Sequence, residues 1–387
     1  MKSWKVSTEE SGDLMKVLIV KTSSLGDITH TFPVAEYLHQ KFPKAQIDWM
    51  VEAPFAELVE AHPFVNHVYR IETKKWRRGR DLGGFLRLRK ALRREMYDAV
   101  FDLQGNFKSG LMTLQAKARQ KVGFGRKTVP EVFNLIATNV KIDPPAGKNI
   151  REDYLYIVQK YFEDTSPFHD QGVRLNISLE QQTEIGMILS HPNLQQGRNV
   201  LVCQGSAWPN KQMNTPAFID FLQRFQKETK CSYLFIWGNE TEKKAVKEIH
   251  HNFQGRSVVV EKLPIPMLQN LMDQLDLVIA MDSLPLHLAG ITSTPTFSIF
   301  GASSANKYRP IGAKHHSFQG TCPYKITFDK RCPKLRSCPT GACIRNLSGT
   351  DVFTKSSHGT FFLVERMRGS LYKFRVNKPE SNERVNQ

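Results

Sequence analysis

The chain has 387 residues, 40% of them hydrophobic, and carries 54 Lys and Arg against 37 Asp and Glu. This length allows two domains of ordinary size, each with its own core. No apolar stretch reaches the roughly 18–20 residues needed to cross a bilayer, and the N-terminal MKSWKVSTEESGD lacks the apolar run of a signal peptide, so we expect a cytoplasmic protein. The net charge of +17 favours an acidic partner, which can be nucleic acid, an anionic membrane or a phosphorylated small molecule.

The first clear pattern is MKVLIVKTSSLGDITHTFP, residues 15–33. Its apolar run Val17–Val20 predicts a buried parallel strand, and a helical pattern follows the loop TSSLGD. Gly26 allows a tight turn or a close approach to a ligand. The N–H groups and hydroxyls of the loop, Ser24 included, suit an anionic or polyol ligand. Asp27 belongs to such a site or is an ordinary helix cap, and this loop alone does not decide between them.

Apolar runs and helical patterns then alternate along the chain. In the first half the runs lie at 16–21, 47–51, 68–71 and 99–103, with helical patterns such as 34–41 and 85–94 between them. Turn residues at 164–172 predict a linker, and the runs recur at 199–203, 231–237, 257–260, 277–281 and 296–300. Such alternation indicates parallel sheets of βαβ units. We predict an α/β fold with two Rossmann-like, doubly wound domains facing a cleft, 14–172 and 173–350, and a basic tail, 351–387.

Polar side chains follow these runs, and in open α/β sheets ligands bind outside the carboxyl ends of the strands. The residues concerned are Asp27; Asp102, Gln104 and Asn106; Gly205, Ser206 and Lys211; Trp237, Gly238 and Glu242; Asp282, Ser283 and His287; and Gly301–Ser304. Lys211 would neutralise a phosphate, to which the helix beginning near Ser283 would offer N–H groups. Glu242 could accept hydrogen bonds from ribose hydroxyls. The simpler alternatives are a core histidine at 287 and an N-cap pair at 282–283.

These segments resemble the bacterial lipopolysaccharide heptosyltransferases of glycosyltransferase family 9. The matching stretches are KTSSLGDITHTFP, YDAVFDLQGNFKSG, GSAWPNKQMN, IWGNETEKKA and MDSLPLHLAGITSTPTFSIFG. The resemblance implies the GT-B fold, with the acceptor on the N-terminal domain and ADP-heptose on the C-terminal one. Within the family, KKWRR before DLQGNFKSG resembles heptosyltransferase I, which adds the first heptose to the Kdo region of lipid A.

The resemblance also implies roles for single residues, with Asp27 as the general base. On the donor side it implies Lys211 for the phosphates, Glu242 for the ribose, Asp282 for the heptose hydroxyls, and Ser283 and His287 beside the diphosphate. We place Ser24, Gly26 and Ser206 on this side too. Two stretches depart from many relatives: Leu284 stands in place of glycine, and Asn149-Ile150-Arg151 in place of a histidine that opens the helix.

The implied chemistry is a single displacement that inverts the anomeric carbon of the donor. An acceptor hydroxyl loses its proton to Asp27, a type of step worth about 10²–10⁴-fold in rate, and Lys211 with helix-end N–H groups stabilises the departing diphosphate. No Asp-x-Asp lies near the expected diphosphate site, so we predict catalysis without a metal or cofactor. The alternatives are heptosyltransferase II, a family 9 enzyme for another sugar, and a non-catalytic sugar-nucleotide-binding protein.

Residues 74–94 hold ten Lys and Arg against one Asp. Apolar residues between the arginines, among them Phe85 and Leu86, predict an amphipathic basic helix suited to an anionic membrane surface. We therefore expect a peripheral protein on the cytoplasmic face of the inner membrane; the simpler alternative is a solvated charged face. The residues expected to bind the phosphates and carboxylates of a Kdo-lipid A acceptor are Lys75, Arg77, Arg78, Gln104 and Lys108.

Two further features leave alternatives open. Cys322, Cys332, Cys338 and Cys343 could ligate zinc, but their C-x₉-C-x₅-C-x₄-C spacing lacks tight Cys-x₂-Cys pairs, and we favour reduced thiols in a loop. Disulfides are not expected in the cytoplasm. The high positive charge also suits nucleic acid, but no stacking aromatics or known binding module accompany it, so we expect no nucleic-acid partner.

Overall fold

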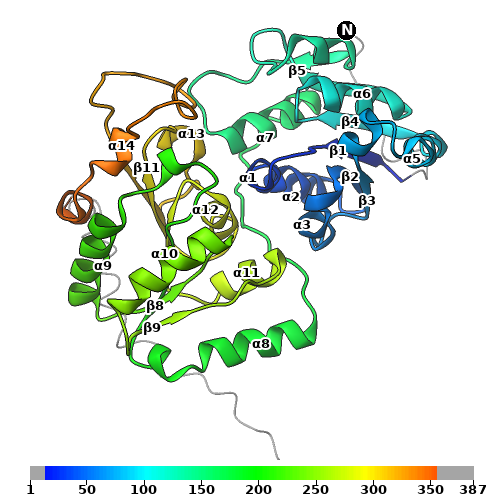
Figure 1. Cartoon of the computed structure of the whole chain (residues 1–387). Coiled ribbons are helices and arrows are strands. Elements are labelled where there is room, and N and C mark those ends of the chain that lie inside the picture. The colour runs from blue at the N-terminus through cyan, green and yellow to red at the C-terminus, as the bar shows by residue number, and fades with distance from the viewer. Residues whose placement is uncertain (1–13, 355–387) are drawn as a thin grey trace, which may run out of the picture.

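The computed structural model describes residues 14–354 (Figure 1). The expected basic tail therefore lies mostly outside the described residues, and so does the side chain of Arg77. Among the described residues, no helix is long and apolar enough to cross a membrane.

The first half of the chain forms a parallel six-stranded sheet in the order β3-β2-β1-β4-β5-β6. Its strands are β1 (Lys16–Val20), β2 (Gln46–Glu52), β3 (His67–Ile71), β4 (Tyr97–Asp102), β5 (Ala118–Phe124) and β6 (Val140–Ile142). Its helices are α1 (Leu25–Thr29), α2 (Phe32–Lys41), η1 (Ala53–Phe55), α3 (Ala56–Glu60), α4 (Thr73–Arg77), α5 (Leu82–Arg94), α6 (Phe107–Gln115), η2 (Val132–Ile136) and α7 (Ile150–Tyr161).

Apolar side chains on both faces bury this sheet between two helix layers. On one face, Leu18 and Val100 pack with Leu88 and Leu92 of α5 and with Met112 of α6. The opposite face packs against α2 and α7 through a second cluster. Burial on both faces explains why the central strands read as continuous apolar runs.

The second half repeats the design with a parallel sheet in the order β12-β11-β10-β7-β8-β9. Its strands are β7 (Asn199–Cys203), β8 (Ser232–Phe235), β9 (Ser257–Val259), β10 (Leu277–Met281), β11 (Thr296–Phe300) and β12 (His315–Gln319). Its helices are α8 (Leu179–Leu189), η3 (Pro192–Leu194), η4 (Pro209–Lys211), α9 (Thr215–Thr229), α10 (Glu240–His251), α11 (Ile265–Met272), α12 (Leu284–Ala289), α13 (Ala305–Tyr308) and α14 (Ala342–Arg345).

Both sheets have the strand order of a Rossmann fold, which reverses direction between β1 and β4 and between β7 and β10. The nine strands predicted from apolar runs are confirmed, with ends that differ by at most two residues. Three strands were not predicted, β5, β6 and β12. All three lie at or next to a sheet edge, where the sequence is more polar.

The two halves contact each other beyond the connecting segment between α7 and α8. The side-chain amide of Asn149, which caps α7, donates to the carbonyls of Asn306 (3.2 Å) and Arg309 (3.0 Å) in and after α13. Within α7, Asp153 accepts a hydrogen bond from Lys307 of α13. The stretch without a histidine at the start of α7 is therefore part of the contact between the halves. The expected linker at 164–172 forms neither helix nor strand.

Candidate active site

Most of the expected site residues follow the four strands that flank the two reversals of strand order. Asp27 follows β1 and Gln104 follows β4, while Ser206 follows β7 and Asp282 follows β10. The carboxyl ends of these strands lie at the point where open α/β sheets bind ligands. In this structure the two edges approach each other, because α1 packs against α12.

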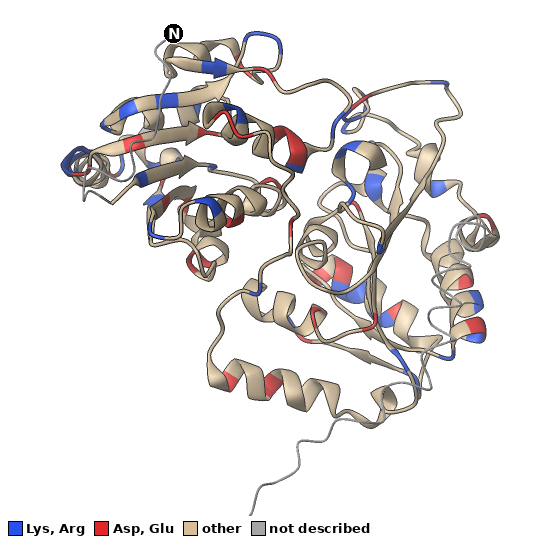
Figure 2. Cartoon of the chain, turned by 180° about the vertical axis from the view of Figure 1, so that it is seen from behind, with Lys and Arg blue, Asp and Glu red and all other residues tan. Residues whose placement is uncertain are grey.

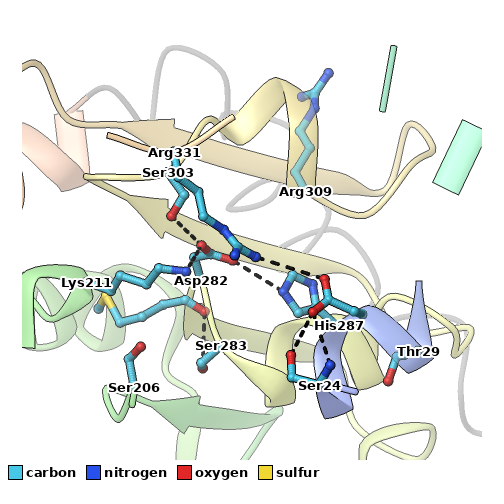
Figure 3. A network of polar contacts seen from close by, with 12 residues as sticks. Ser24, Thr29, Ser206, Lys211, Asp282, Ser283, His287, Ser303, Arg309 and Arg331 are labelled. Carbon is cyan, nitrogen blue, oxygen red and sulfur yellow. Dashed lines mark hydrogen bonds and ion pairs between the residues drawn. The ribbon is translucent and has the colours of Figure 1, made fainter. Parts of the chain in front are cut away.

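Asp27 lies in the first turn of α1, and its Oδ2 accepts hydrogen bonds from the amide (3.2 Å) and hydroxyl (2.8 Å) of Ser24. It therefore caps the helix. The carboxylate is also about a quarter exposed, and its Oδ1 lies 4.0 Å from the guanidinium of Arg331 in the second half (Figure 3). Asp27 therefore both caps α1 and remains partly exposed on the side that faces the other half.

The surroundings of Asp27 favour its charged form. Burial opposes ionisation, but the Lys21 ammonium, the Ser24 hydroxyl and the Arg331 guanidinium outweigh it and lower the pKa of Asp27. Lys21 is itself buried at the end of β1, where its ammonium donates to the Leu103 carbonyl (2.8 Å) and the Tyr154 hydroxyl (2.7 Å). Burial lowers the pKa of Lys21 to about 8. A carboxylate that is ionised and partly exposed can accept a proton.

A buried carboxylate, Asp282, organises the second half of the site (Figure 3). Its Oδ2 lies 2.5 Å from the Lys211 ammonium and also accepts a hydrogen bond from Ser303. Its Oδ1 lies 3.2 Å from Nε2 of His287. Burial opposes ionisation of Asp282, but His287 and Lys211 outweigh it and hold its pKa well below the usual range.

The imidazole of His287 lies between this cluster and the first half. Burial lowers the pKa of His287, which favours the neutral ring, and Nε2 then carries the proton because a carboxylate only accepts. On its other side the ring meets His30, with centroids 4.2 Å apart. A Cβ on Gly26 would lie 3.0 Å from Cδ2 of His287. Gly26 thus allows α1 to approach the histidine of the other half.

The remaining donor-side residues follow the carboxyl ends of β7, β8 and β10. Oε2 of Glu242 accepts from the Gly238 amide (2.7 Å), and a Cβ on Gly205 would lie 2.5 Å from the Glu242 carboxyl carbon. Ser206 lies in the same loop as Gly205, and its carbonyl accepts a hydrogen bond from the side chain of Gln212 (2.7 Å); Figure 3 shows it with Lys211 and Ser283. Ser283 occupies the N-cap position of α12 but its side chain makes no capping hydrogen bond, and the helix is only six residues long with a proline in its first turn. It therefore offers fewer N–H donors than expected.

The residues expected on the acceptor side lie on the first half. Oε1 of Gln104 accepts from the amides of Thr22 (3.1 Å) and Ser23 (3.2 Å), so it holds the loop that leads to Asp27. The Lys108 ammonium lies 3.8 Å from Oε1 of Glu52. Lys75 pairs with Glu72, and Arg78 is exposed after α4. Lys75 and Arg78 thus lie on a different element from Gln104 and Lys108.

Sequence reasoning missed Arg331, which a long irregular segment brings to the site. Residues on either side of it pair with the chain after β11: the Ser304 amide donates to the Lys330 carbonyl (2.9 Å), and the Cys332 amide to the Ala302 carbonyl (2.8 Å). The Arg331 guanidinium lies over the Tyr308 ring, 4.9 Å from its centroid. Arg331 follows no predicted strand; its position depends on these long-range contacts, which the sequence pattern does not show.

A family model of glycosyltransferase family 9 (heptosyltransferase) matches residues 85–336, more than half of the chain. The chain belongs to this family. It is therefore a glycosyltransferase, as the sequence motifs implied. Asp27 precedes the matched stretch, while Lys211, Glu242, Asp282 and Arg331 lie within it.

Curated relatives place this family 9 enzyme among proteins of lipopolysaccharide synthesis. Lipopolysaccharide heptosyltransferase 1 of Campylobacter coli is 27% identical over 299 residues, 75% of this chain and 84% of the relative. Its namesake in Pseudomonas aeruginosa is 26% identical over 75% and 79%. Lipopolysaccharide heptosyltransferase 3 of Escherichia coli is 25% identical over 74% and 83%. Heptosyltransferases of two types thus match about equally well.

Solved structures share the fold. E. coli heptosyltransferase WaaC with ADP aligns with a TM-score of 0.70 at 20% identity, over 89% of this chain and all of that one. E. coli ADP-heptose lipopolysaccharide heptosyltransferase II aligns with a TM-score of 0.67 at 18% identity, over 92% of this chain and all of that one. The family 9 enzyme has the GT-B fold of these proteins, which confirms the predicted fold class.

The cysteine-rich segment of this family 9 enzyme lies beside the donor-side cluster. Its four thiols line a cavity of about 380 Å³ together with Asn210, which precedes Lys211. The Asn210 amide donates to the carbonyls of Leu335 and Cys338, each at 2.9 Å. All six cysteines are free, and within residues 14–354 no three Cys, His, Asp or Glu side chains are arranged to hold a metal ion.

Proposed function

We propose that this enzyme transfers heptose from ADP-heptose to a sugar hydroxyl of the Kdo region of lipid A, with inversion at the anomeric carbon. One observation carries the proposal: a partly exposed Asp27 on one half faces the Asp282–Lys211–His287 cluster on the other, with Arg331 4.0 Å from Asp27. Groups suited to removing a proton and to binding polyols and phosphates would thus meet where α1 contacts α12. The names of the curated relatives support the choice of sugar and acceptor class.

The proton transfer is assigned to Asp27. An acceptor hydroxyl within hydrogen-bond reach of this carboxylate gives up its proton while its oxygen attacks the anomeric carbon of the donor. The bond from that carbon to the ADP oxygen breaks, and ADP leaves with the electron pair. Attack opposite to the leaving group inverts the anomeric configuration. Gln104, which accepts from two loop amides, holds the base in place.

The donor is assigned to the second half, residues 173–350. Lys211 is the cation closest to Asp282 and would neutralise the diphosphate as its charge develops. Asp282, fixed by its hydrogen bonds, presents a carboxylate to the heptose hydroxyls. Glu242 would accept from the ribose, and its approach requires Gly205. Ser206, Ser283 and Ser24 would add hydroxyl contacts around the diphosphate.

The acceptor is assigned to residues 14–172. Lys75, Arg77, Arg78 and Lys108 would meet its phosphates and carboxylates. A lipid-anchored acceptor also calls for a peripheral position at the inner membrane. We favour transfer of the first heptose because KKWRR resembles heptosyltransferase I; the second candidate is transfer to an already heptosylated core, which the match to heptosyltransferase 3 supports.

The test is release of ADP from ADP-heptose with Kdo-lipid A or with its heptosylated form as acceptor. Turnover with the first acceptor alone supports the proposal, and turnover with the second alone supports the second candidate. Asp27→Asn should lower turnover by about 10²–10⁴-fold with little change in the affinity for ADP. Asp220→Asn is the control, because this aspartate lies partly exposed on α9, where it pairs with Arg224. Near-normal turnover of Asp27→Asn would refute the assignment of the base.

A further inference from the structure

Exposed apolar side chains gather on one side of the first half. Of fifteen large hydrophobic residues that are exposed in the described chain, nine lie between residues 82 and 136. Six of them come from two packed elements and are called here the α6–η2 patch: Phe107, Leu111 and Leu114 of α6, and Val132, Phe133 and Ile136 of η2. Single exposed apolar residues are ordinary, whereas a contiguous apolar patch marks an interaction site.

The patch is held outward by a buried polar network. In η2 the polar Asn134 is fully buried, while Val132, Phe133 and Ile136 are 70%, 71% and 77% exposed. The Asn134 amide donates to Oδ2 of Asp102 (2.7 Å) and to the Asn106 carbonyl (3.0 Å). This is the reverse of ordinary patterning, in which apolar residues turn inward. The hydrogen bonds of the buried Asn134 therefore keep the apolar side chains of η2 exposed to solvent.

The two elements of the patch form one surface. The rings of Phe107 and Phe133 meet edge to face, with centroids 6.3 Å apart, and the Phe107 amide donates to the Glu131 side chain (2.8 Å). On α6, Phe107, Leu111 and Leu114 recur at the spacing of a single helical face. The buried face of the same helix carries Met112.

Much of the positive charge of the chain lies in the same stretch of sequence as this surface. Residues 74–127 contain sixteen Lys and Arg against four Asp and Glu, most of the net charge of the chain. α5 and α6 cover the same face of the sheet, so their outer surfaces turn the same way, and α5 lies on the side of the first half that faces away from the second (Figure 1). Exposed basic residues on α5 include Arg89, Lys90 and Arg93, and Figure 2 shows Lys and Arg gathered at this helix.

We propose that the α6–η2 patch and the outer face of α5 form one docking surface for an anionic lipid bilayer. The apolar side chains enter the interface while the arginines and lysines meet the headgroups. Apolar and basic signals are both present, and stable peripheral binding generally takes two. The sequence indicated only the basic helix; the apolar half of the surface emerges from the fold.

The surface also lies next to the acceptor side of the site. Phe107 follows Asn106, which caps α6, and lies three residues after Gln104, the residue that holds the Asp27 loop. The docking surface and the acceptor side thus belong to the same half of the chain and share the segment from Gln104 to Phe107. The inference rests on the proposed function for its purpose, because a lipid-anchored acceptor is what brings such an enzyme to a bilayer, but the binding itself needs no acceptor.

The test is flotation of the full chain with vesicles of phosphatidylcholine, alone or mixed with phosphatidylglycerol, with no acceptor or donor present. We expect binding to the mixed vesicles that weakens with salt. The triple variant Val132→Ser, Phe133→Ser and Ile136→Ser should bind at least about tenfold more weakly, because three exposed side chains no longer enter the interface. Since lipid binding is measured without substrate, a failure of the proposed transfer reaction would leave this result standing.

The control is Leu179→Ser with Met187→Ser on α8, which removes comparably exposed apolar side chains from the second half. It should bind like the unaltered chain, and both variants should keep its thermal midpoint and ADP affinity. Equal vesicle binding by the triple variant would overturn the proposal. The proposal would also be overturned if light scattering showed the unaltered chain to be a dimer and the triple variant a monomer. In that case the patch would be covered by a second copy of the chain.

Discussion

The buried pair between Lys211 and Asp282 leads to an asymmetric effect on stability. The ammonium and Oδ2 are 2.5 Å apart, and the side chains are 9% and 5% exposed. Asp282 keeps hydrogen bonds from Ser303 and His287 when Lys211 is replaced. When Asp282 is replaced, the ammonium loses its carboxylate in a site from which water is nearly excluded. Asp282→Asn should therefore cost more than Lys211→Met.

The magnitudes follow from the number of partners left. Removing one member of a buried ion pair costs about 3–5 kcal/mol, and Asp282→Asn should fall in that range. In Lys211→Met, two donors still stabilise the carboxylate, and hydrogen bonds to charged groups are worth about 1.5–3 kcal/mol, so we expect a loss of about 1–3 kcal/mol. The double variant removes both charges and should be more stable than Asp282→Asn alone.

The assay is urea unfolding at neutral pH followed by circular dichroism, which gives a free energy of unfolding for each variant. The pH dependence of this free energy of unfolding is a second test. Because the folded state lowers the pKa of Asp282, its contribution is complete above the unfolded pKa of about 3.9 and is lost as pH falls through the lower, folded value. The Asp282→Asn variant should lack this pH-dependent contribution to stability. A greater loss for Lys211→Met than for Asp282→Asn, or a double variant at the sum of the two, would refute this reasoning.

Two further predictions concern contacts between the halves. Arg331→Gln removes the cation 4.0 Å from Asp27, so the pKa of Asp27 should rise and the acidic limb of the kcat/KM profile should move to higher pH. The shift should stay within about one unit, because the arginine is half exposed and solvent screens it. Gly26→Ala places a methyl group 3.0 Å from the His287 ring, so the base and the donor cluster should separate and kcat should fall about tenfold or more.

Each of these variants has a matched control. Arg336→Gln alters an arginine of the same segment that lies over Trp208, 4.6 Å from the ring centroid, and should leave the acidic limb where it is. Gly186→Ala adds a methyl group on α8 that meets nothing within 4 Å, and should leave kcat unchanged. The geometry described would be contradicted if Arg331→Gln left the acidic limb of the kcat/KM profile at its original pH. It would also be contradicted if Gly26→Ala kept the kcat of the unaltered enzyme.

The sequence predicted the central strands because parallel strands buried on both faces consist of apolar runs. It did not predict β12, because HHSFQ at a sheet edge carries no such run. The site residues were found for the same reason as the strands: Asp27, Lys211 and Asp282 each follow a strand that the pattern reveals. Arg331 follows no strand. Its place depends on backbone pairing with residues 302–304, a long-range contact that no local pattern encodes.

Asp102 shows where the rule of polar residues after strands points to the wrong role. It follows β4 like the ligand-binding candidates, but it is fully buried and accepts hydrogen bonds from Ser109 (3.0 Å), Thr113 (3.1 Å) and Asn134 (2.7 Å). A buried carboxylate must be satisfied by donors, and here α6 and η2 supply them. Because Asn134 is one of these donors, it occupies the buried side of η2, and its apolar neighbours remain exposed. Exposure of Phe133 is therefore a consequence of satisfying Asp102, which hydrophobicity read residue by residue does not reveal.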